Sequence, residues 1–474
     1  MRRTLAVLML CASVLAQLQA SEPGSALEVA FGQAEITPES LEQRAVWLAG
    51  YAMNRRATGI HDALYARCVL LRHESRTFAL ISLDLIGLQY PAIQRIRAQL
   101  ADYTHVTVSS THNHEGPDVI GVWGRSPIHR GVDDLYVNLV IAKTVAAVRE
   151  AESHFAPATV CYGTAADESL LNDSREPYVK DGVLRTLRFN DPSSGRVVGV
   201  LVQWNCHPET LGSRNTLITA DYPAATIAAL RERWDCPVTF FCGAVGGLMA
   251  PPQDRIRNEQ GQVLGSGDFE FARRYGVAVA ELANQALADA QPIRLDPLRA
   301  YAKTIMIPVE NPAYRLARVL GVLRRQGRTW TGDFEQLGEL VTAETADGPT
   351  GVETEVAYLR LGELHVACIP GEIYPELVYG KVQDPPDPGA DFADAPPEPA
   401  VTNLLPGSKW LLLGLANDEL GYIIPKRQWD NKPPYAYGRG TWQYGEINSC
   451  GPEIAPIVMQ ALSNRVRDAE RDVR

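Results

Sequence analysis

Two histidines spaced one residue apart stand in the most polar stretch of this sequence. His112 and His114 lie within the run Ser109 to Asp118, which follows a β-rich segment and contains the turn Gly116-Pro117. Side chains two positions apart on a strand point to the same side, so we expect both imidazoles to converge on one point that the turn leaves open. Such a pair can hold a zinc ion, or it can be a hydrogen-bonded pair at a strand end. The motif alone leaves both interpretations open.

Three further segments have the same construction, an apolar run that ends at a polar residue beside proline or glycine. They end in His207-Pro208, in Pro370-Gly371-Glu372 and in Asn417, with Tyr422 soon after. Functional groups of α/β proteins gather at such strand ends, and a third histidine with a carboxylate would complete a four-coordinate zinc site. Taken singly, His207 is better explained as a hydrogen-bonded core histidine and Glu372 as a carboxylate in the first turn of a helix.

Other chemistry is excluded or left open by the rest of the sequence. His61 lies in a turn-like segment that suits either the edge of a site or a structural role. The chain has no Gly-x-Ser-x-Gly elbow, phosphate-binding loop or dinucleotide fingerprint, which argues against a serine hydrolase or a nucleotide enzyme. Its 45 basic and 56 acidic residues give a net charge of −11, and no basic run marks a surface for nucleic acid.

The elements that must position these residues alternate β-rich runs with amphipathic helices, which predicts a layered α/β protein. We expect helices to begin at Pro91, after Asp133 and at Asp221, and the second of these to bury Leu135 and Val148. Buried strands are predicted at 77–86, from 106, and at 197–202, 238–241, 364–369 and 410–415. No linker separates two domains. We therefore predict one large catalytic domain, residues 21–474, in which layered mixed sheets are flanked by helices and the metal site lies at strand ends.

The first 20 residues have the order of a secretory signal. Arg2 and Arg3 precede an apolar run from Leu5 to Leu15, and small residues up to Ala20 follow. This run is shorter than the roughly 18 residues of a membrane-spanning helix. We expect residues 1–20 to be removed and the protein, without a transmembrane segment, to be secreted or periplasmic. Seven cysteines then remain, an odd number whose pairing the sequence leaves open.

One segment departs from the α/β pattern. Residues 383–400 are rich in proline and acidic residues and contain no basic residue, so they cannot form a helix or a central strand. We expect a surface loop there. A loop of this length inside a domain is either a lid over a site or a disordered insertion, and the sequence does not decide between them.

Taken together and in this order, the motifs resemble the catalytic domain of the neutral/alkaline (non-lysosomal) ceramidases and their bacterial relatives. The matching segments run from about residue 28 to 465: Gly50-Tyr51, Gly59-Ile60-His61, Ser82-Leu83-Asp84, Thr111 to Pro117, His207-Pro208, Pro370-Gly371-Glu372 and Tyr422. The resemblance implies a zinc amidase whose Zn²⁺ ligands are His112, His207, Glu372 and Tyr422. It also implies catalytic roles for His114 and Tyr422 and for Arg175, which is similar to a basic site residue of the family.

Two departures from the family pattern bear on the substrate. Where ceramidases carry a Ser-Asn-Leu-Gly-Asp segment, this chain has Ala244 at the serine position and Leu248 at the aspartate position. We also expect no appended C-terminal β-sandwich. The resemblance implies an exported zinc amidohydrolase of ceramide or a related N-acyl lipid, and the sequence leaves peripheral contact with a membrane open. The alternatives are a zinc hydrolase of the same fold that acts on a different amide, ester or lactone, and a non-catalytic binding protein. The oligomeric state is left open.

Overall fold

A computed structural model describes residues 26–341 and 348–472 of the chain, so the predicted signal at 1–20 lies outside the described residues. Three five-stranded mixed sheets form the centre of the molecule. In the first sheet the strand order is β5-β4-β3-β1-β6, and β4 and β5 form its parallel pair. Its strands are β1 (Glu28–Glu35), β3 (Tyr65–His73), β4 (Arg76–Leu83), β5 (His105–Ser110) and β6 (Ala156–Pro157).

The second and third sheets repeat this plan, with one parallel pair each. The second has the order β11-β9-β8-β7-β12, with β9 parallel to β11. Its strands are β7 (Thr159–Ala166), β8 (Val183–Asn190), β9 (Val197–Trp204), β11 (Val238–Cys242) and β12 (Gln291–Ile293). The third has the order β13-β15-β16-β18, with β14 added beside β15 and β16 parallel to β18. Its strands are β13 (Leu298–Pro308), β14 (Gly327–Thr329), β15 (Thr350–Leu361), β16 (Leu364–Cys368) and β18 (Trp410–Leu413).

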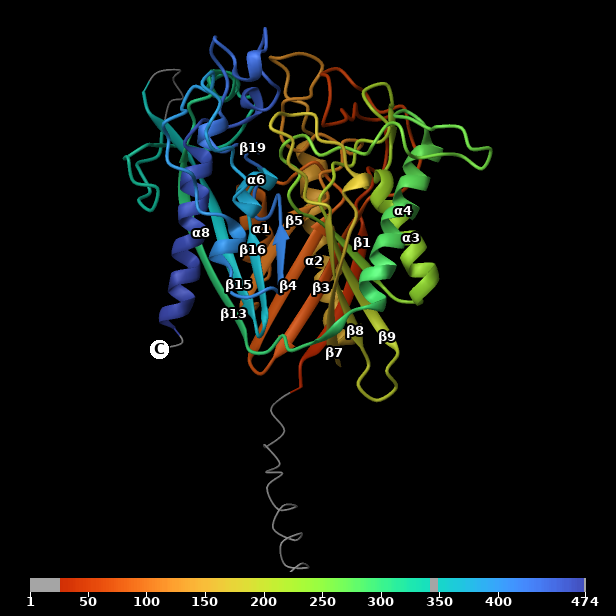
Figure 1. Cartoon of the computed structure of the whole chain (residues 1–474). Helices are drawn as coiled ribbons and strands as arrows, with labels where there is room; N and C mark the ends of the chain where they lie inside the picture. The colour runs from red at the N-terminus through yellow and green to blue at the C-terminus, as the bar shows by residue number, and fades with distance from the viewer. Residues whose placement is uncertain (1–25, 342–347, 473–474) are drawn as a thin grey trace, which may run out of the picture.

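The three sheets pack around a shared apolar core, and helices cover their outer faces. The central core joins Phe78 of the first sheet, Leu201 of the second and Val366 of the third. Outside it, α1 and α2 pack on the first sheet, α3 and α4 on the second and α8 on the third, so that α8 and the α3–α4 pair lie on opposite sides of the molecule (Figure 1). These helices are α1 (Tyr90–Gln99), α2 (Asp134–Ala151), α3 (Asp221–Trp234), α4 (Phe269–Ala288) and α8 (Ile454–Arg471).

Polar contacts join the three sheets where their parallel pairs end. Asn417, just after β18, accepts a hydrogen bond from the Val108 amide of β5 at 3.0 Å and donates its own amide to the Val108 carbonyl at 2.6 Å. The Ser109 hydroxyl donates to the Gly414 carbonyl at 2.7 Å, and the Gly414 amide donates to the Cys242 carbonyl of β11 at 2.9 Å. The carboxyl ends of these strands are therefore held at one place.

The structure confirms the predicted fold class, with one local correction. The expected strands and helices are present to within a few residues, and Asp133 caps α2 by accepting from the Leu135 amide. Leu135, however, is not buried; it is 54% exposed. It lies in the first turn of α2, where the inward face is taken by Tyr136 and Val137, so the helical pattern was assigned to the wrong face at this position.

The proline-rich segment 383–400 contains neither helix nor strand and runs between the short helices α6 (Pro375–Tyr379) and α7 (Val401–Leu404). It is fastened to the chain that follows β19 (Tyr422–Ile423): the Asp391 amide donates to the Trp429 carbonyl, and the Arg427 guanidinium donates to the Ala395 carbonyl, each at 2.9 Å. Phe392 packs against a buried aromatic cluster that contains Tyr374 and Tyr422. These contacts do not fit a disordered insertion.

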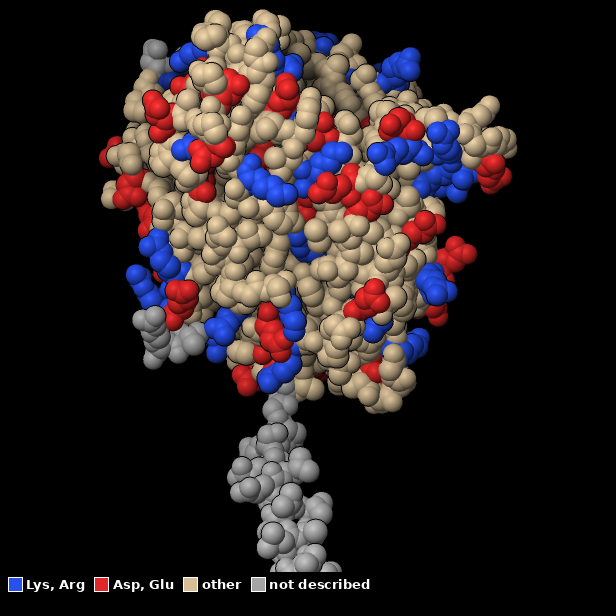
Figure 2. Space-filling model, in the orientation of Figure 1, with Lys and Arg blue, Asp and Glu red and all other residues tan. Residues whose placement is uncertain are grey.

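The surface shows no block of one charge on the face drawn in Figure 2, where basic and acidic side chains are interspersed around a broad uncharged area. Among the residues described, no helix combines the length and the apolar character that crossing a bilayer requires. The seven cysteines of the described chain, Cys68 to Cys450, all carry free thiols.

Candidate metal centre and active site

His112 and His114 converge as predicted, but a loop brings them together rather than a strand. Strand β5 already ends at Ser110, and His112 has a backbone φ of +67°, in the left-handed region that non-glycine residues rarely adopt. The two imidazole rings lie 4.8 Å apart between centroids and nearly at right angles. The alternation of side chains along a strand was therefore the wrong reason for a correct juxtaposition.

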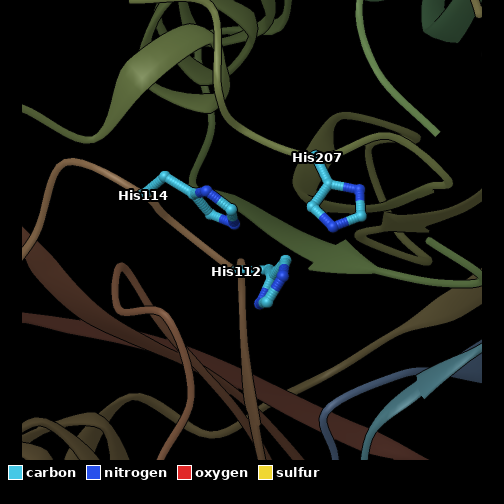
Figure 3. A group of neighbouring side chains, drawn as sticks. All are labelled: His112, His114 and His207. Atoms are coloured by element: carbon cyan, nitrogen blue, oxygen red, sulfur yellow. The ribbon is translucent and has the colours of Figure 1, made fainter. Parts of the chain in front are cut away.

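His207 joins this pair from the second sheet. It follows β9, and its amide donates to the Met249 carbonyl at 2.8 Å. Its ring centroid lies 4.7 Å from that of His112 and 5.4 Å from that of His114. One ligand nitrogen from each of the three residues falls within 4.8 Å of the others, and the three side chains point toward a common centre (Figure 3).

Backbone carbonyls fix the orientation of two of these imidazoles. His112 Nδ1 donates to the Ile86 carbonyl at 2.7 Å, and His207 Nδ1 donates to the Met249 carbonyl at 2.9 Å. A neutral imidazole whose Nδ1 carries the proton presents the Nε2 lone pair to the other side. Outer hydrogen bonds of this kind orient metal-ligating histidines and set their tautomer.

Glu372 supplies a carboxylate to the same centre. Its Oε2 lies 3.0 Å from His207 Nε2 and 3.3 Å from His112 Nε2. Burial alone would raise the pKa of this carboxyl, but the neighbouring His112 and His207 outweigh burial and hold its pKa at about 2. The centre is thus lined by two nitrogen atoms and one charged oxygen that face one another.

Tyr422 reaches the cluster because two very short strands pair. Strands β17 (Glu372–Ile373) and β19 (Tyr422–Ile423) are parallel, with Glu372 directly opposite Tyr422. The Tyr422 side chain is 4% exposed, and its ring centroid lies 6.5 Å from that of His207. Burial and the nearby Glu372 carboxylate raise the pKa of its phenol well above the usual value.

His114 is the least constrained of the three histidines. Neither of its ring nitrogens has a side-chain hydrogen-bond partner; the Glu209 carboxylate is 3.9 Å from Nδ1, and the Tyr51 ring lies edge-on to the imidazole. Arg55 donates to its main-chain carbonyl. Burial, with the adjacent His112 and His207, lowers its pKa well below the usual value. His114 is therefore a neutral imidazole, and neither of its ring nitrogens has a hydrogen-bond partner.

The structure does not bring Arg175 into this cluster. Its guanidinium is 2% exposed, forms an ion pair with Glu446 at 2.6 Å, and donates to the carbonyls of Tyr444 and Gln428. It lies 5.6 Å from the centre of the Tyr374 ring. These contacts hold the loop that carries Tyr444, and a direct catalytic role for Arg175 stays a prediction.

The segment that departs from the ceramidase pattern borders the site. The Ala244 amide donates to the Asn205 side chain, and Ala244 is fully buried. Leu248 lies at the surface of a cleft beside His207 and packs against the aromatic cluster around Tyr422. An apolar side chain therefore stands where the family pattern would place an aspartate.

Two cavities meet at the histidines. An inner cavity of about 110 Å³ has mainly apolar walls, with polar groups from His112, Glu372, Tyr422 and Glu419. An outer cleft of about 650 Å³ opens the site to solvent past Tyr51 and Glu209. His114, Tyr422 and Tyr444 border both spaces. The proline-rich segment 383–400 lines neither of them, so the structure gives it no position as a lid.

The donor set fits a zinc ion. Two imidazole Nε2 atoms, a carboxylate and a phenol come from four separate strand ends, and His114 lies beside them. Zinc in catalytic sites takes nitrogen and oxygen ligands and keeps one position open. Two buried imidazoles held as Nδ1 tautomers around a charged carboxylate match this ligand chemistry.

Some residues of the site escaped the sequence analysis. Glu209 follows His207-Pro208 directly, so its place in the motif was the only available signal. Tyr444 and Glu419 gave no signal, because each lies in an irregular segment. His61 does not join the site; it stacks on Phe269 at the surface.

Comparison with known proteins identifies a matching sequence family and a matching fold. The family described as neutral/alkaline non-lysosomal ceramidase, N-terminal, matches residues 27–236. Among solved structures, the neutral ceramidase from Pseudomonas aeruginosa is similar with a TM-score of 0.68 and 17% identity, over 94% of this chain and 75% of that one. A ceramidase complexed with C2 is similar with a TM-score of 0.67 and 16% identity, over 94% and 76% of the two chains. No curated protein sequence matches the chain significantly.

The matched residues include the three histidines of the cluster and Arg175, whereas Glu372 and Tyr422 lie beyond them. At 16–17% identity the structural likeness, which covers 94% of this chain, establishes the fold. Residues 27–236 thus match the neutral/alkaline non-lysosomal ceramidase family, and the fold of the chain is that of the neutral ceramidases.

Proposed function

We propose that this protein is an exported zinc-dependent amidohydrolase that cleaves the amide bond of ceramide or a related N-acyl lipid. One observation carries the proposal: the Nε2 atoms of His112 and His207 face the Glu372 carboxylate where an apolar inner cavity meets a solvent-open cleft. The family match of residues 27–236 supports the reaction class.

Zinc would be held by His112, His207, Glu372 and Tyr422. Bound there, it supplies Lewis-acid polarisation of a carbonyl and lowers the pKa of a water from about 16 toward about 7. The chain contributes the orientation of the ligands: the Ile86 and Met249 carbonyls keep both ligand imidazoles in one tautomer and one rotation.

His114 and Tyr422 perform the proton transfer and the charge stabilisation in this proposal. His114 is neutral and borders both cavities, so it can take a proton from the attacking water and return it to the leaving amine. The Tyr422 phenol keeps its proton because its pKa is raised, so as a neutral ligand at the junction it can also donate to the amide oxygen as negative charge develops there. Burial of both groups excludes competing water and strengthens these interactions.

A lipid amide suits the two cavities. Ile86, Val309 and Leu420 give the inner cavity an apolar wall, and the outer cleft leaves room for a chain to extend toward solvent. A second candidate, a different amide, an ester or a lactone, is favoured by Leu248, which puts an apolar side chain at the cleft where the family pattern has an acid.

The test combines metal analysis with a substrate panel on purified protein. We expect close to one zinc per chain and turnover of an N-acyl sphingoid base above that of a matched ester and a lactone. His207→Ala should lower zinc content and turnover together, because one neutral nitrogen ligand is lost. His154→Ala, at an exposed position outside the site, is the matched control.

The possible results distinguish between the candidate functions. Full zinc content and turnover in His207→Ala would remove His207 from the site. Zinc binding with faster ester or lactone turnover would select the second candidate. Zinc binding without hydrolysis of any panel member would favour a binding protein.

Export is part of the proposal and rests on residues 1–20 alone. When the full chain is produced in a bacterium, we expect it in the periplasm or medium with a new N-terminus near residue 21. Retention in the cytoplasm with residues 1–20 intact would contradict export.

Contact with a membrane surface is supported by an apolar rim beside the site. Helix α5 (Pro312–Val319) places Tyr314 in the wall of the inner cavity, while Leu316 and Leu320 point outward and are 51% and 46% exposed. The α5 cap Asn311 donates to the carbonyl of Ile447, whose own side chain is exposed as well. Leucine and isoleucine side chains grouped beside a lipid-binding cavity suit insertion into the headgroup region.

Flotation with phosphatidylcholine vesicles tests this rim. Leu316→Ser combined with Leu320→Ser should lower the bound fraction and the hydrolysis of substrate held in vesicles, while hydrolysis of a short soluble amide stays unchanged. Val263→Ser removes an equally exposed apolar side chain elsewhere and should change neither. Equal flotation of all three proteins would refute the membrane contact.

A further inference from the structure

One carboxyl group in the wall of the inner cavity has no role in the reaction described above. Glu419 lies three residues before Tyr422 and borders the same space as Glu372 and Tyr422. Its Oε1 accepts a hydrogen bond from the Gly421 amide at 2.8 Å. Its Oε2 is buried and has no hydrogen-bond partner. A buried oxygen without a partner costs free energy, so its presence calls for an explanation.

The surrounding chain is built to hold Glu419 in this position. A Cβ atom at Gly87 would lie 2.5 Å from Glu419 Cβ and 2.6 Å from Cγ, so only glycine leaves room for the side chain there. The neighbouring Asp418 fixes the backbone: its Oδ1 accepts from the Glu419 amide at 2.8 Å and from the Tyr90 amide at 2.9 Å.

An arginine in the wall of the same cavity is already engaged. Arg325, which also borders the inner cavity, donates to both carboxylate oxygens of Asp418 rather than to Glu419. Glu419 therefore has one oxygen anchored to the main chain and one without a partner, and its side chain borders a space whose walls include Ile86, Val309 and Val352. A polar group of a molecule that enters this space can pair with the Glu419 carboxyl group.

We propose that Glu419 is a specificity-determining residue that binds a hydroxyl group of the substrate within a few bonds of the scissile amide. A hydroxyl both donates and accepts, so it pairs with a carboxyl group whether or not that group is ionised. An alkyl chain at the same place leaves Oε2 unsatisfied. This inference rests on the proposed function and names the polar feature that the substrate carries.

The hydroxyl can belong to either half of the amide, and matched substrates separate the two. One pair is an N-acyl amino alcohol and its deoxy analogue; the other is a 2-hydroxyacyl amide and its unsubstituted acyl analogue. For one pair we expect wild-type protein to favour the hydroxylated member by at least about tenfold in kcat/KM, as sites built around a substrate hydroxyl do.

Three variants test the residue. Glu419→Leu should abolish that preference by raising KM for the hydroxylated member, with kcat and the rate on the other member within about twofold of wild type. Glu419→Gln keeps a donor and an acceptor and should retain part of the preference. Gly87→Ala should reproduce the Glu419→Leu result, because the added methyl group displaces the Glu419 side chain. Zinc content and thermal melting establish that each variant is folded.

A binding measurement separates this inference from the proposed function. Calorimetry with a long-chain amino alcohol and with the matching alkylamine requires no hydrolysis, and wild-type protein should bind the alcohol more tightly while Glu419→Leu binds both alike. If no amide is cleaved, the proposed function fails and the calorimetry still tests Glu419. If amides are cleaved but neither pair is discriminated, or if Glu419→Leu keeps the preference, the assignment of Glu419 is overturned and the hydrolase stands.

Discussion

The positive backbone φ of His112 turns the chain so that His112 and His114 face His207. A positive φ is unfavourable for a side chain with a Cβ and persists where surrounding contacts enforce it. Here the chain turns sharply after β5, and the Ile86 carbonyl captures Nδ1. Without this turn, His112 and His114 would follow the strand geometry instead of facing His207. This strained residue therefore helps to shape the candidate site.

The substitution Tyr422→Phe separates a catalytic role of the Tyr422 hydroxyl from packing of its ring. The ring is buried and packs against Tyr374 and Tyr444, and phenylalanine keeps its volume. We expect the variant to fold and to keep much of its zinc through the three remaining ligands, yet to lose on the order of a hundredfold or more in kcat, as removal of an oxyanion stabiliser does. Steady-state kinetics on an N-acyl substrate, metal content and thermal melting of one preparation provide the measurement.

Tyr374→Phe is the matched control for this experiment. Tyr374 belongs to the same aromatic cluster, is fully buried and has a hydroxyl without a hydrogen-bond partner. Its conversion to phenylalanine should leave turnover close to wild type. If both variants keep wild-type turnover, Tyr422 is a packing residue, and the role transferred to it from the ceramidases is wrong.

Among individual residues of the candidate site, the sequence predicted those that belong to recognisable motifs and few others. His112, His114 and His207 were found because histidines at strand ends are rare and chemically distinctive. Glu419 was not, since one acid in a loop has no recognisable spacing and its meaning depends on Gly87, more than 300 positions away in the chain.

The short parallel pair β17 and β19 determines which side chains become neighbours. Two residues in each strand are enough to place Glu372 opposite Tyr422. Sequence patterns cannot predict strands of this length, because alternation needs at least four residues to be recognised. The longer strands β9 and β16 were predictable for the opposite reason, as each is an apolar run bounded by polar or turn residues.

The proline-rich segment supports residues of the site and does not cover its cavities. Phe392 packs against the cluster that contains Tyr422, and the segment lines neither cavity. We expect Phe392→Ala to lower kcat several-fold and equally for long-chain and short-chain substrates, because loosening Tyr422 affects every amide alike. A lid would instead alter KM for long chains.

Kinetics on an acyl-chain series measure this difference. The substitution Phe155→Ala, at a partly buried aromatic residue on the far side of the first sheet, controls for a general loss of packing. A change in KM that grows with chain length in Phe392→Ala alone would restore the lid interpretation.

At the scale of the whole molecule, the sequence predicted the α/β class and the mixed sheets but not how three sheets share one core. Strand order depends on pairings between distant segments, such as β16 with β18, which are separated by α6, the proline-rich segment and α7. Local sequence patterns do not predict which distant strands pair.

Several buried carboxyl groups make the stability of the fold depend on pH. Burial raises the pKa of Glu376 to about 8, and burial likewise raises the pKa of Glu115 to about 8 and that of Asp221 to about 7. Between the ordinary glutamate value near 4.5 and pH 8, the folded state holds protons that the unfolded state has lost. Stability therefore falls as pH rises through this window.

The substitution Glu376→Gln tests this sign. The amide cannot ionise, so we expect the melting temperature of this variant to fall less between pH 5 and pH 8 than that of the wild type, as measured by calorimetry at several pH values. Glu363→Gln, at a surface glutamate paired with Lys409, serves as the comparison. Parallel melting curves for Glu376→Gln and wild type would show that Glu376 does not contribute to the pH dependence.

The joined strand ends determine at which stage of folding a metal ion can bind. The candidate ligands are spread from position 112 to position 422, and they meet only where all three sheets end together. No short segment of the chain carries all the candidate ligands, so uptake of a metal by this centre would follow the docking of the sheets instead of guiding it. A chain that crosses a membrane unfolded would thus arrive empty, and the metal supply of the destination, rather than that of the cytoplasm, would decide which ion it holds.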